Sequence, residues 1–258
     1  MDAVRARFED YLRRLGAVAE SRDDVVGLAG FGSTAERSRV DEWSDHDFAW
    51  ITEPGAENRY RFDLSWLPDA DAIALSVVEH HGGVKVVYND GQVLEFGIAN
   101  PQSFREWAGN RIEVVVDKGG IADAVAHILT KPLPTGDRDD VRDIRLFCTQ
   151  ILIGMGRARR GEVLSGSRLI REDAVGRLLT VLGSRLPGDR DRLDTLDPFR
   201  RFDFVHPEVA QRIEAAIRLP LDDGSRTLVD LAEELLADGW DDFPRAGVAA
   251  LRGKLGWN

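Results

Sequence analysis

The chain has 258 residues, which is long enough for one large domain or two modest ones with a proper hydrophobic core. Apolar residues make up 43% of it and charged residues 31%, which favours a folded globular protein over a disordered one. A formal net charge of -11 argues against a general nucleic-acid-binding surface, because such surfaces gather lysine and arginine to neutralise phosphates. We therefore expect a small-molecule partner of cationic character and no nucleic acid.

Membrane and export segments are the next classes that the sequence argues against. No stretch approaches the roughly 20 consecutive apolar residues that span a bilayer, so no membrane partner is expected. The first five residues, Met-Asp-Ala-Val-Arg, lead into charged sequence and do not resemble a signal peptide. The single cysteine, Cys148, cannot form an internal disulfide, and its neighbours Phe147 and Ile151 indicate core packing. These features predict a cytoplasmic protein.

The first 130 residues contain one helix signal and a series of strand signals. Residues 2–20 place apolar side chains at spacings of three and four from Val4 to Leu15, which predicts an amphipathic helix. Short β-branched or aromatic runs then predict six strands, over residues 25–29, 48–51, 73–78, 84–88, 93–98 and 112–116. Asn-Asp-Gly at 89–91 has the chemistry of a tight turn, so the fourth and fifth strands should form a hairpin.

The character of the sequence changes near residue 130. The segment 131–136, Lys-Pro-Leu-Pro-Thr-Gly, is interpreted as a linker, and the sequence after it has helical periodicity. We expect helices at residues 137–160, 167–186, 207–219, 227–237 and 244–255. The predicted fold class is α+β, with a domain of mixed sheet and helices over 1–130 and a helical bundle domain over 137–258.

A glycine-serine pair follows the first predicted strand. Gly32 allows the backbone to approach a ligand closely, and Ser33 offers a hydroxyl and a favourable N-cap for a helix. Exposed amides at the start of a helix bind phosphate. Gly32 and Ser33 are therefore predicted to cradle the phosphates of a nucleoside triphosphate.

Three acidic residues follow at positions that suit a metal ion. Asp45 and Asp47 are two apart at a predicted strand, so both side chains should leave the same face, where two carboxylates repel unless they share a cation. Glu95 lies between Leu94 and Phe96 in a later strand and should face the opposite way from both. Mg2+ takes one or two carboxylates together with substrate phosphates. We predict that Asp45, Asp47 and Glu95 bind magnesium.

The spacing of these residues resembles a known signature. Gly32-Ser33, eleven intervening residues, Asp45-His46-Asp47 and the later Glu95 resemble the motif of the DNA polymerase β type of nucleotidyltransferases, over about 65 residues of the chain. The acidic motif and the helical domain after it look most like the bacterial adenylyltransferases that act on aminoglycosides or lincosamides. The resemblance implies a nucleotidyltransferase domain at 1–130 and the helical domain at 137–258.

The same resemblance implies an activity and roles for the acidic residues. It implies transfer of AMP from ATP to a hydroxyl of a small cationic acceptor, such as an aminoglycoside-like antibiotic, and hence antibiotic resistance. Asp45 and Asp47 would hold the magnesium ion that binds the triphosphate, and a second ion would be shared with Glu95. Glu95 would also take the proton of the acceptor hydroxyl, as the glutamate of the streptomycin-type enzymes does.

The chain departs from the family pattern after the Gly-Ser pair. Many relatives have Ala-Arg-Gly there, whereas this chain has Ala35-Glu36-Arg37, so we expect Glu36 to point to solvent and Arg37 to help bind phosphates. Trp43 either stacks on a base or packs, and Lys85 either reaches a phosphate or faces water. Two other functions stay open: a catalytically silent relative that senses a nucleotide or binds a partner, and nucleotide transfer to a protein.

Overall fold

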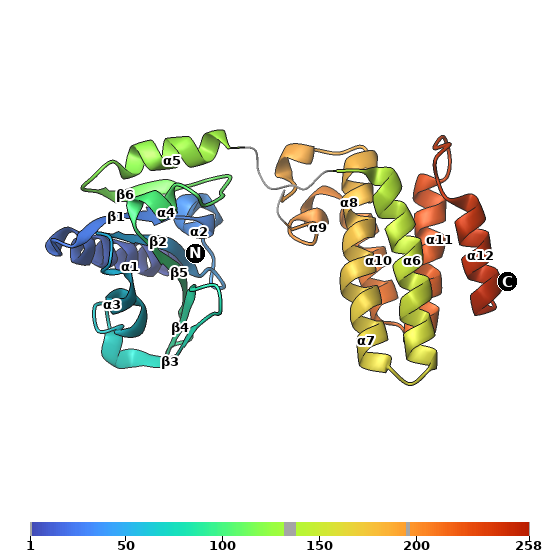
Figure 1. Ribbon diagram of the computed structural model, residues 1–258, viewed down its shortest axis with the longest axis horizontal. Helices are drawn as coiled ribbons and strands as arrows, with labels where there is room; N and C mark the ends of the chain where they lie inside the picture. Colours follow the sequence, from blue (N-terminus) through green and yellow to red (C-terminus); the bar gives the residue numbers. More distant parts are fainter. Residues whose placement is uncertain (1, 132–137, 195–196, 258) are drawn as a thin grey trace. The chain divides into compact units, whose positions relative to one another are not determined.

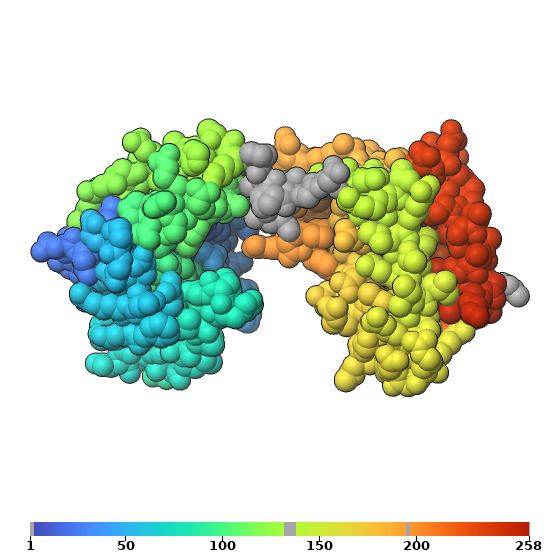
Figure 2. All heavy atoms as spheres, in the orientation of Figure 1, coloured from blue at the N-terminus to red at the C-terminus, as the bar shows by residue number. Residues whose placement is uncertain are grey.

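The chain divides into two compact units, Met1–Pro134 and Thr135–Asn258. The computed structural model describes residues 2–131, 138–194 and 197–257. The predicted linker lies outside the described residues apart from Lys131. Each unit has a hydrophobic core of its own and is described by itself (Figure 1). Figure 2 shows one face of each unit with the heavy atoms drawn as spheres.

A six-stranded mixed sheet forms the centre of the first unit, with the strand order β3-β4-β5-β2-β1-β6. The strands are β1 (Val25–Gly30), β2 (His46–Thr52), β3 (Ile73–Val78), β4 (Val84–Tyr88), β5 (Val93–Ala99) and β6 (Glu113–Asp117). All neighbouring pairs are antiparallel except β2 and β5, which run parallel. Every predicted strand is present, and its ends lie within two residues of the expected ones.

The predicted tight turn joins β4 to β5. Gly91 has a φ of 86°, a conformation that glycine adopts without a steric penalty. Asp90 Oδ1 accepts a hydrogen bond of 3.0 Å from the backbone N–H of Gln92, which fixes the turn further. In the register that results, Lys85 lies directly opposite Glu95.

Helices cover both faces of this sheet (Figure 1). The helices of the first unit are α1 (Asp2–Ser21), α2 (Gly32–Ala35), α3 (Glu57–Phe62), α4 (Pro101–Phe104) and α5 (Ile121–Thr130). On one face, Leu15 of α1 packs in a hydrophobic core with Phe48 of β2. On the other face, Ile121 of α5 packs in a separate core with Ala49 and Ile51 of β2. Successive residues of β2 thus alternate between two buried layers, as the pleat of a strand requires.

The second unit consists of helices around one large hydrophobic core. Its α-helices are α6 (Asp140–Arg159), α7 (Val163–Arg168), α8 (Val175–Arg185), α9 (Phe202–Val205), α10 (Pro207–Arg218), α11 (Leu221–Leu236) and α12 (Arg245–Leu255). A π-helical turn, Leu169–Ala174, joins α7 to α8. The α+β class, with a mixed sheet followed by a helical region, is confirmed.

Two of the predicted helices begin earlier than expected. The helix expected at 167–186 begins at Val163. The one expected at 227–237 begins at Leu221, because Asp222 and Asp223 suit the positive end of the helix dipole in the first turn. Gly224 lies within this helix, and a side chain there would collide with the backbone oxygen of Ala216 in the neighbouring helix. Among the described residues, no helix is long and apolar enough to cross a membrane.

Candidate metal centre

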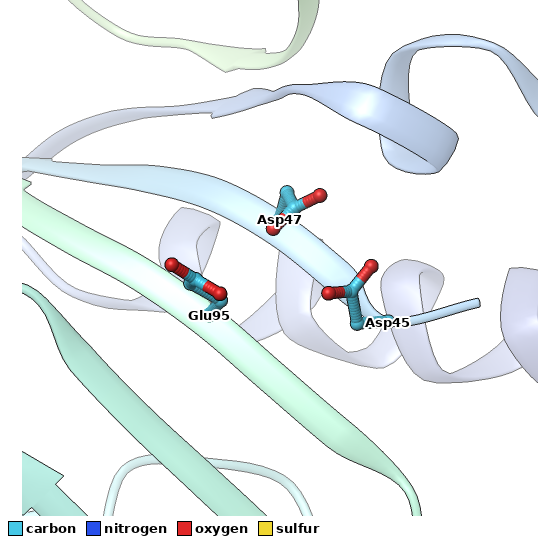
Figure 3. A group of neighbouring side chains, drawn as sticks. All are labelled: Asp45, Asp47 and Glu95. Carbon is cyan, nitrogen blue, oxygen red and sulfur yellow. The ribbon is translucent and has the colours of Figure 1, made fainter. Parts of the chain in front are cut away.

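Three carboxylates meet on one face of the sheet (Figure 3). Asp45 immediately precedes β2, Asp47 is the second residue of β2, and Glu95 belongs to β5. Asp47 and Glu95 are register partners of the parallel pair β2 and β5. One ligand oxygen from each of the three residues lies within 4.8 Å of the others. The structure therefore brings together all three residues for which the sequence predicts metal binding.

The alternation of side chains along each strand explains this convergence. Leu94 and Phe96 are buried in the core beneath α1, whereas the Glu95 side chain between them is 46% exposed on the other face. In β2, His46 and Phe48 are buried on the α1 side, and Asp47 therefore leaves the sheet on the side of Glu95. The pleat of β2 and β5 therefore places Asp47 and Glu95 on the same face of the sheet.

The loop after β1 supports Asp47 through its backbone. The N–H of Phe31 donates a hydrogen bond of 2.9 Å to the carbonyl oxygen of Asp47, and the N–H of Asp47 donates one of 3.1 Å to Thr34 Oγ1. Gly32 has a φ of 49°, and a Cβ atom built there would lie 2.6 Å from Asp47 Oδ2. Gly32 is thus the residue that leaves room for the Asp47 carboxylate.

The expected role of Ser33 as an N-cap is wrong. The short helix α2 begins at Gly32, its N-cap position is Phe31, and no side chain caps it. Ser33 is the second residue inside this single turn, because the chain enters the helix at the left-handed Gly32, two residues earlier than an N-cap at Ser33 would allow. Gly32 and Ser33 lie next to the acidic cluster through the contact of Gly32 with Asp47. Binding of phosphates by these two residues stays a prediction.

His46 anchors the acidic motif to α1. Its ring stacks on Phe8 with 3.7 Å between the ring centroids, and its Nε2 lies 3.0 Å from the carbonyl oxygen of Phe8. The pKa of His46 is lowered to about 4, mainly by burial; the hydrogen bond to Phe8 opposes this shift, and the charge of Arg37 adds to it. At neutral pH the ring is uncharged and acts as a rigid apolar and hydrogen-bonded support between Asp45 and Asp47.

Lys85 is a neighbour of the site whose role the sequence left open. Its Nζ lies 3.2 Å from Glu95 Oε1 and 3.8 Å from Glu79 Oε1. The hydrogen bond to Glu95 is the main cause that raises the pKa of Lys85, and the charges of Glu95, Glu79 and Asp45 act in the same direction. Only the register of the β4–β5 hairpin identifies Lys85 as the partner of Glu95.

The residues after the Gly-Ser pair form ion pairs within the first unit. Arg37 pairs with Glu9 of α1 at 3.1 Å and with Glu113 of β6 at 2.8 Å, so its guanidinium links elements of the fold. Its expected help with phosphates stays a prediction. Glu36 pairs with Arg111 and Arg39, and its side chain is 26% exposed, so it is only partly solvated.

Trp43 lies in the same region of the first unit. Its side chain is 85% exposed, which rules out the packing role that the sequence left open. Its backbone N–H donates a hydrogen bond of 2.9 Å to Asp41 Oδ1, in the turn that leads into the acidic motif.

The donor set of this cluster suits a hard divalent cation. Three carboxylates converge on one point with one oxygen each, and no histidine or cysteine contributes to the group. Carboxylate oxygens are the ligands that Mg2+ prefers, and like-charged carboxylates at this separation repel unless a cation lies between them. The residues therefore fit a magnesium ion.

Comparisons with known proteins find a likeness among the solved structures. No protein-family model matches the chain, and no curated protein sequence matches it. The crystal structure of an aminoglycoside 6-adenyltransferase from Bacillus subtilis is similar, with 10% sequence identity, a TM-score of 0.35, and coverage of 96% of this chain and 98% of that chain. That protein falls in the group that the Gly-Ser and acidic motif resembles. At this TM-score the likeness carries no argument, and the function is argued from the acidic cluster.

Proposed function

We propose that the first unit transfers a nucleoside monophosphate, AMP from ATP, to a hydroxyl group of a small acceptor. The observation that carries the proposal is the convergence of Asp45, Asp47 and Glu95 from two adjacent strands, with ligand oxygens within 4.8 Å of one another. Asp45, Asp47 and Glu95 would hold magnesium. When bound there, the ion supplies charge neutralisation for the triphosphate and polarises the phosphorus that is attacked.

Residues of the chain have two further roles in the proposed reaction, proton transfer and placement of the triphosphate. Glu95 is the general base: the acceptor oxygen attacks the α-phosphorus, its proton passes to a Glu95 carboxylate oxygen, and the bond from the α-phosphorus to the leaving pyrophosphate breaks. Asp45 and Asp47 belong to the chain segment that Phe31 and Thr34 hold by hydrogen bonds, so they place the triphosphate. Gly32 lies against the Asp47 carboxylate, and Gly32 and Ser33 would contact the phosphates.

The acceptor that suits this chain is small and cationic. A net charge of -11 attracts a polyamine-like hydroxylated molecule, such as an aminoglycoside-like antibiotic, and disfavours a nucleic acid. An acceptor of this kind would make the protein an antibiotic-resistance enzyme of the cytoplasm.

The test is an assay of pyrophosphate release with Mg2+, ATP and a panel of hydroxylated cationic compounds. Release that depends on one acceptor supports the proposal, and mass spectrometry should then find AMP attached to that acceptor. Asp47→Asn should abolish release. Glu106→Gln is the matched control, since Glu106 is an exposed carboxylate that pairs with Lys131 outside the acidic cluster.

Two outcomes would redirect the proposal. Magnesium-dependent ATP binding without pyrophosphate release for any acceptor would indicate a nucleotide-sensing protein. Transfer of label from ATP to a polypeptide would identify a protein as the acceptor.

A further inference from the structure

A lysine lies against the third carboxylate of the acidic cluster. Lys85 of β4 is the register partner of Glu95, and its Nζ lies 3.2 Å from Glu95 Oε1. Asp47 of β2 is the register partner of the same glutamate from the opposite side. Lys85, Glu95 and Asp47 therefore form a row across β4, β5 and β2 on one face of the sheet, with the cation at one end.

The Lys85–Glu95 pair contributes little to folding. The two side chains are 40% and 46% exposed, and ion pairs with this exposure to solvent contribute little to stability. The pair matters mainly for the net charge of the acidic cluster. Three carboxylates bring three negative charges to one point, and the ammonium of Lys85 offsets one of them.

We propose that Lys85 is a positioning residue that competes with the divalent ion for Glu95, so that the site binds a free divalent ion weakly and favours the ion that arrives with the nucleotide. The inference rests on the proposed function. A positive charge beside Glu95 weakens the attraction of the cluster for a free divalent cation. The same charge attracts the complex of magnesium with a nucleoside triphosphate, because that complex has a net negative charge.

Removal of the charge should therefore change two affinities in opposite directions. Lys85→Met keeps most of the aliphatic stem and removes the ammonium. At low ionic strength, Mn2+ alone should bind to Lys85→Met about tenfold more tightly than to the parent protein. The magnesium complex of α,β-methylene-ATP should bind about threefold more weakly, since the α–β bond of this analogue is not cleaved and binding alone is measured.

Isothermal titration calorimetry on the full chain measures both affinities. Lys85→Arg keeps the charge and should behave like the parent towards both ligands. Lys131→Met is the matched control, because Lys131 also forms an ion pair in the first unit, 3.4 Å from Glu106 Oε2, and belongs to no metal-binding group. It should leave both affinities unchanged.

The outcomes separate this inference from the function on which it rests. Damage to the fold would weaken the binding of both ligands. Opposite shifts in the two affinities therefore identify an effect of charge. Mn2+ binding that is unchanged or weaker in Lys85→Met overturns the role of Lys85, and the metal site still stands if Asp47→Asn abolishes Mn2+ binding. An absence of Mn2+ binding in both the parent and Lys85→Met overturns the metal site, and the inference with it.

Discussion

Glu95 lies one strand away from Asp47 and is more exposed than the residues on either side of it. Glu95→Gln preserves the shape of the side chain but removes its ability to accept a proton. We expect turnover to fall at least roughly 100-fold, the usual scale for loss of a general base. Affinity for magnesium-ATP should change little, because Asp45 and Asp47 keep the nucleotide's metal. Separate measurements of kcat and of the nucleotide Kd test this.

The matched control for Glu95 is again Glu106→Gln, which should leave both quantities unchanged. Asp47→Asn should differ in kind from Glu95→Gln, with nucleotide affinity and turnover both reduced. If Glu95→Gln kept full turnover on a confirmed acceptor, Glu95 would be an ordinary residue of the sheet surface.

Gly32 offers a test of the loop that supports Asp47. In Gly32→Ala the new Cβ would lie 2.6 Å from Asp47 Oδ2, so the carboxylate must shift from its position in the acidic cluster. We expect Mn2+ affinity to fall about tenfold or more, together with a loss of about 1–2 kcal/mol of stability from the positive φ. Calorimetric titration and urea unfolding measure the two effects.

Gly91→Ala separates strain from displacement of the carboxylate. Gly91 also has a positive φ, 86°, but a Cβ atom there has no neighbour within 4 Å. This variant should lose similar stability and keep its metal affinity. Equal metal affinity in both alanine variants would show that Gly32 does not govern the position of Asp47.

The sequence predicted the acidic residues because their spacing is a local property. Two aspartates at i and i+2 leave a strand on one face, and a glutamate between Leu94 and Phe96 must face away from a buried layer. Lys85 needed more information, because its contact with Glu95 follows from the hairpin register and not from sequence distance. The partners of Arg37 are equally non-local, since they belong to α1 and β6.

At the scale of elements, α1 and β2 are joined by one buried histidine. His46 is 1% exposed, lies against Phe8 of α1, and is followed by Asp47 of the acidic cluster. A charged ring in this layer would lack hydration. Protonation of His46 should therefore loosen α1 from the sheet on the side opposite to the carboxylates.

Stability should depend on this histidine below neutral pH. The pKa of His46 is about 4 in the fold against an ordinary 6.5, so between these values the unfolded chain binds a proton that the native state does not. The contribution is complete above pH 6.5 and is lost as the pH falls towards 4. At a pH of about 5 it should amount to roughly 2 kcal/mol of lost unfolding free energy.

Comparison with His46→Gln isolates this contribution from the titration of carboxylates. The glutamine amide can still donate to the carbonyl oxygen of Phe8 but does not titrate. Urea midpoints of both proteins, measured from about pH 5 to pH 7.5, should converge towards the acid end. Parallel pH profiles would mean that His46 titrates alike in the folded and unfolded chains.

Sequence periodicity predicted the elements unevenly. The six strands were found because each is short, β-branched or aromatic and bounded by turn residues. Helix α5 was missed, although Ile121, Ala124, Val125 and Ile128 have helical spacing and are all buried. Helix α3 has only six residues, which is too few for periodicity to show. The π-helical turn before α8 has no sequence signal that we can identify.

At the scale of the whole molecule, charge is the property that bears on the acceptor. Aspartate and glutamate number 45 against 34 lysines and arginines, which gives the net charge of -11. Many of the arginines form ion pairs within their own unit, for example Arg212 with Glu234 and Arg252 with Asp230. The excess of acidic residues thus gives the molecule a negative field, which attracts cations and repels polyanions.

This field predicts how salt affects the proposed reaction. For a polycationic acceptor, kcat/KM should fall about tenfold as ionic strength rises from about 20 to about 200 mM, because screening weakens electrostatic steering. A neutral polyhydroxyl acceptor assayed at the same magnesium and ATP concentrations should show a much smaller change, and it separates steering from effects of salt on the nucleotide. Steady-state pyrophosphate release measures both. A salt-independent kcat/KM for the cation would show that the acidic excess plays no part in acceptor capture, and a neutral molecule or a protein would then be the better acceptor to test.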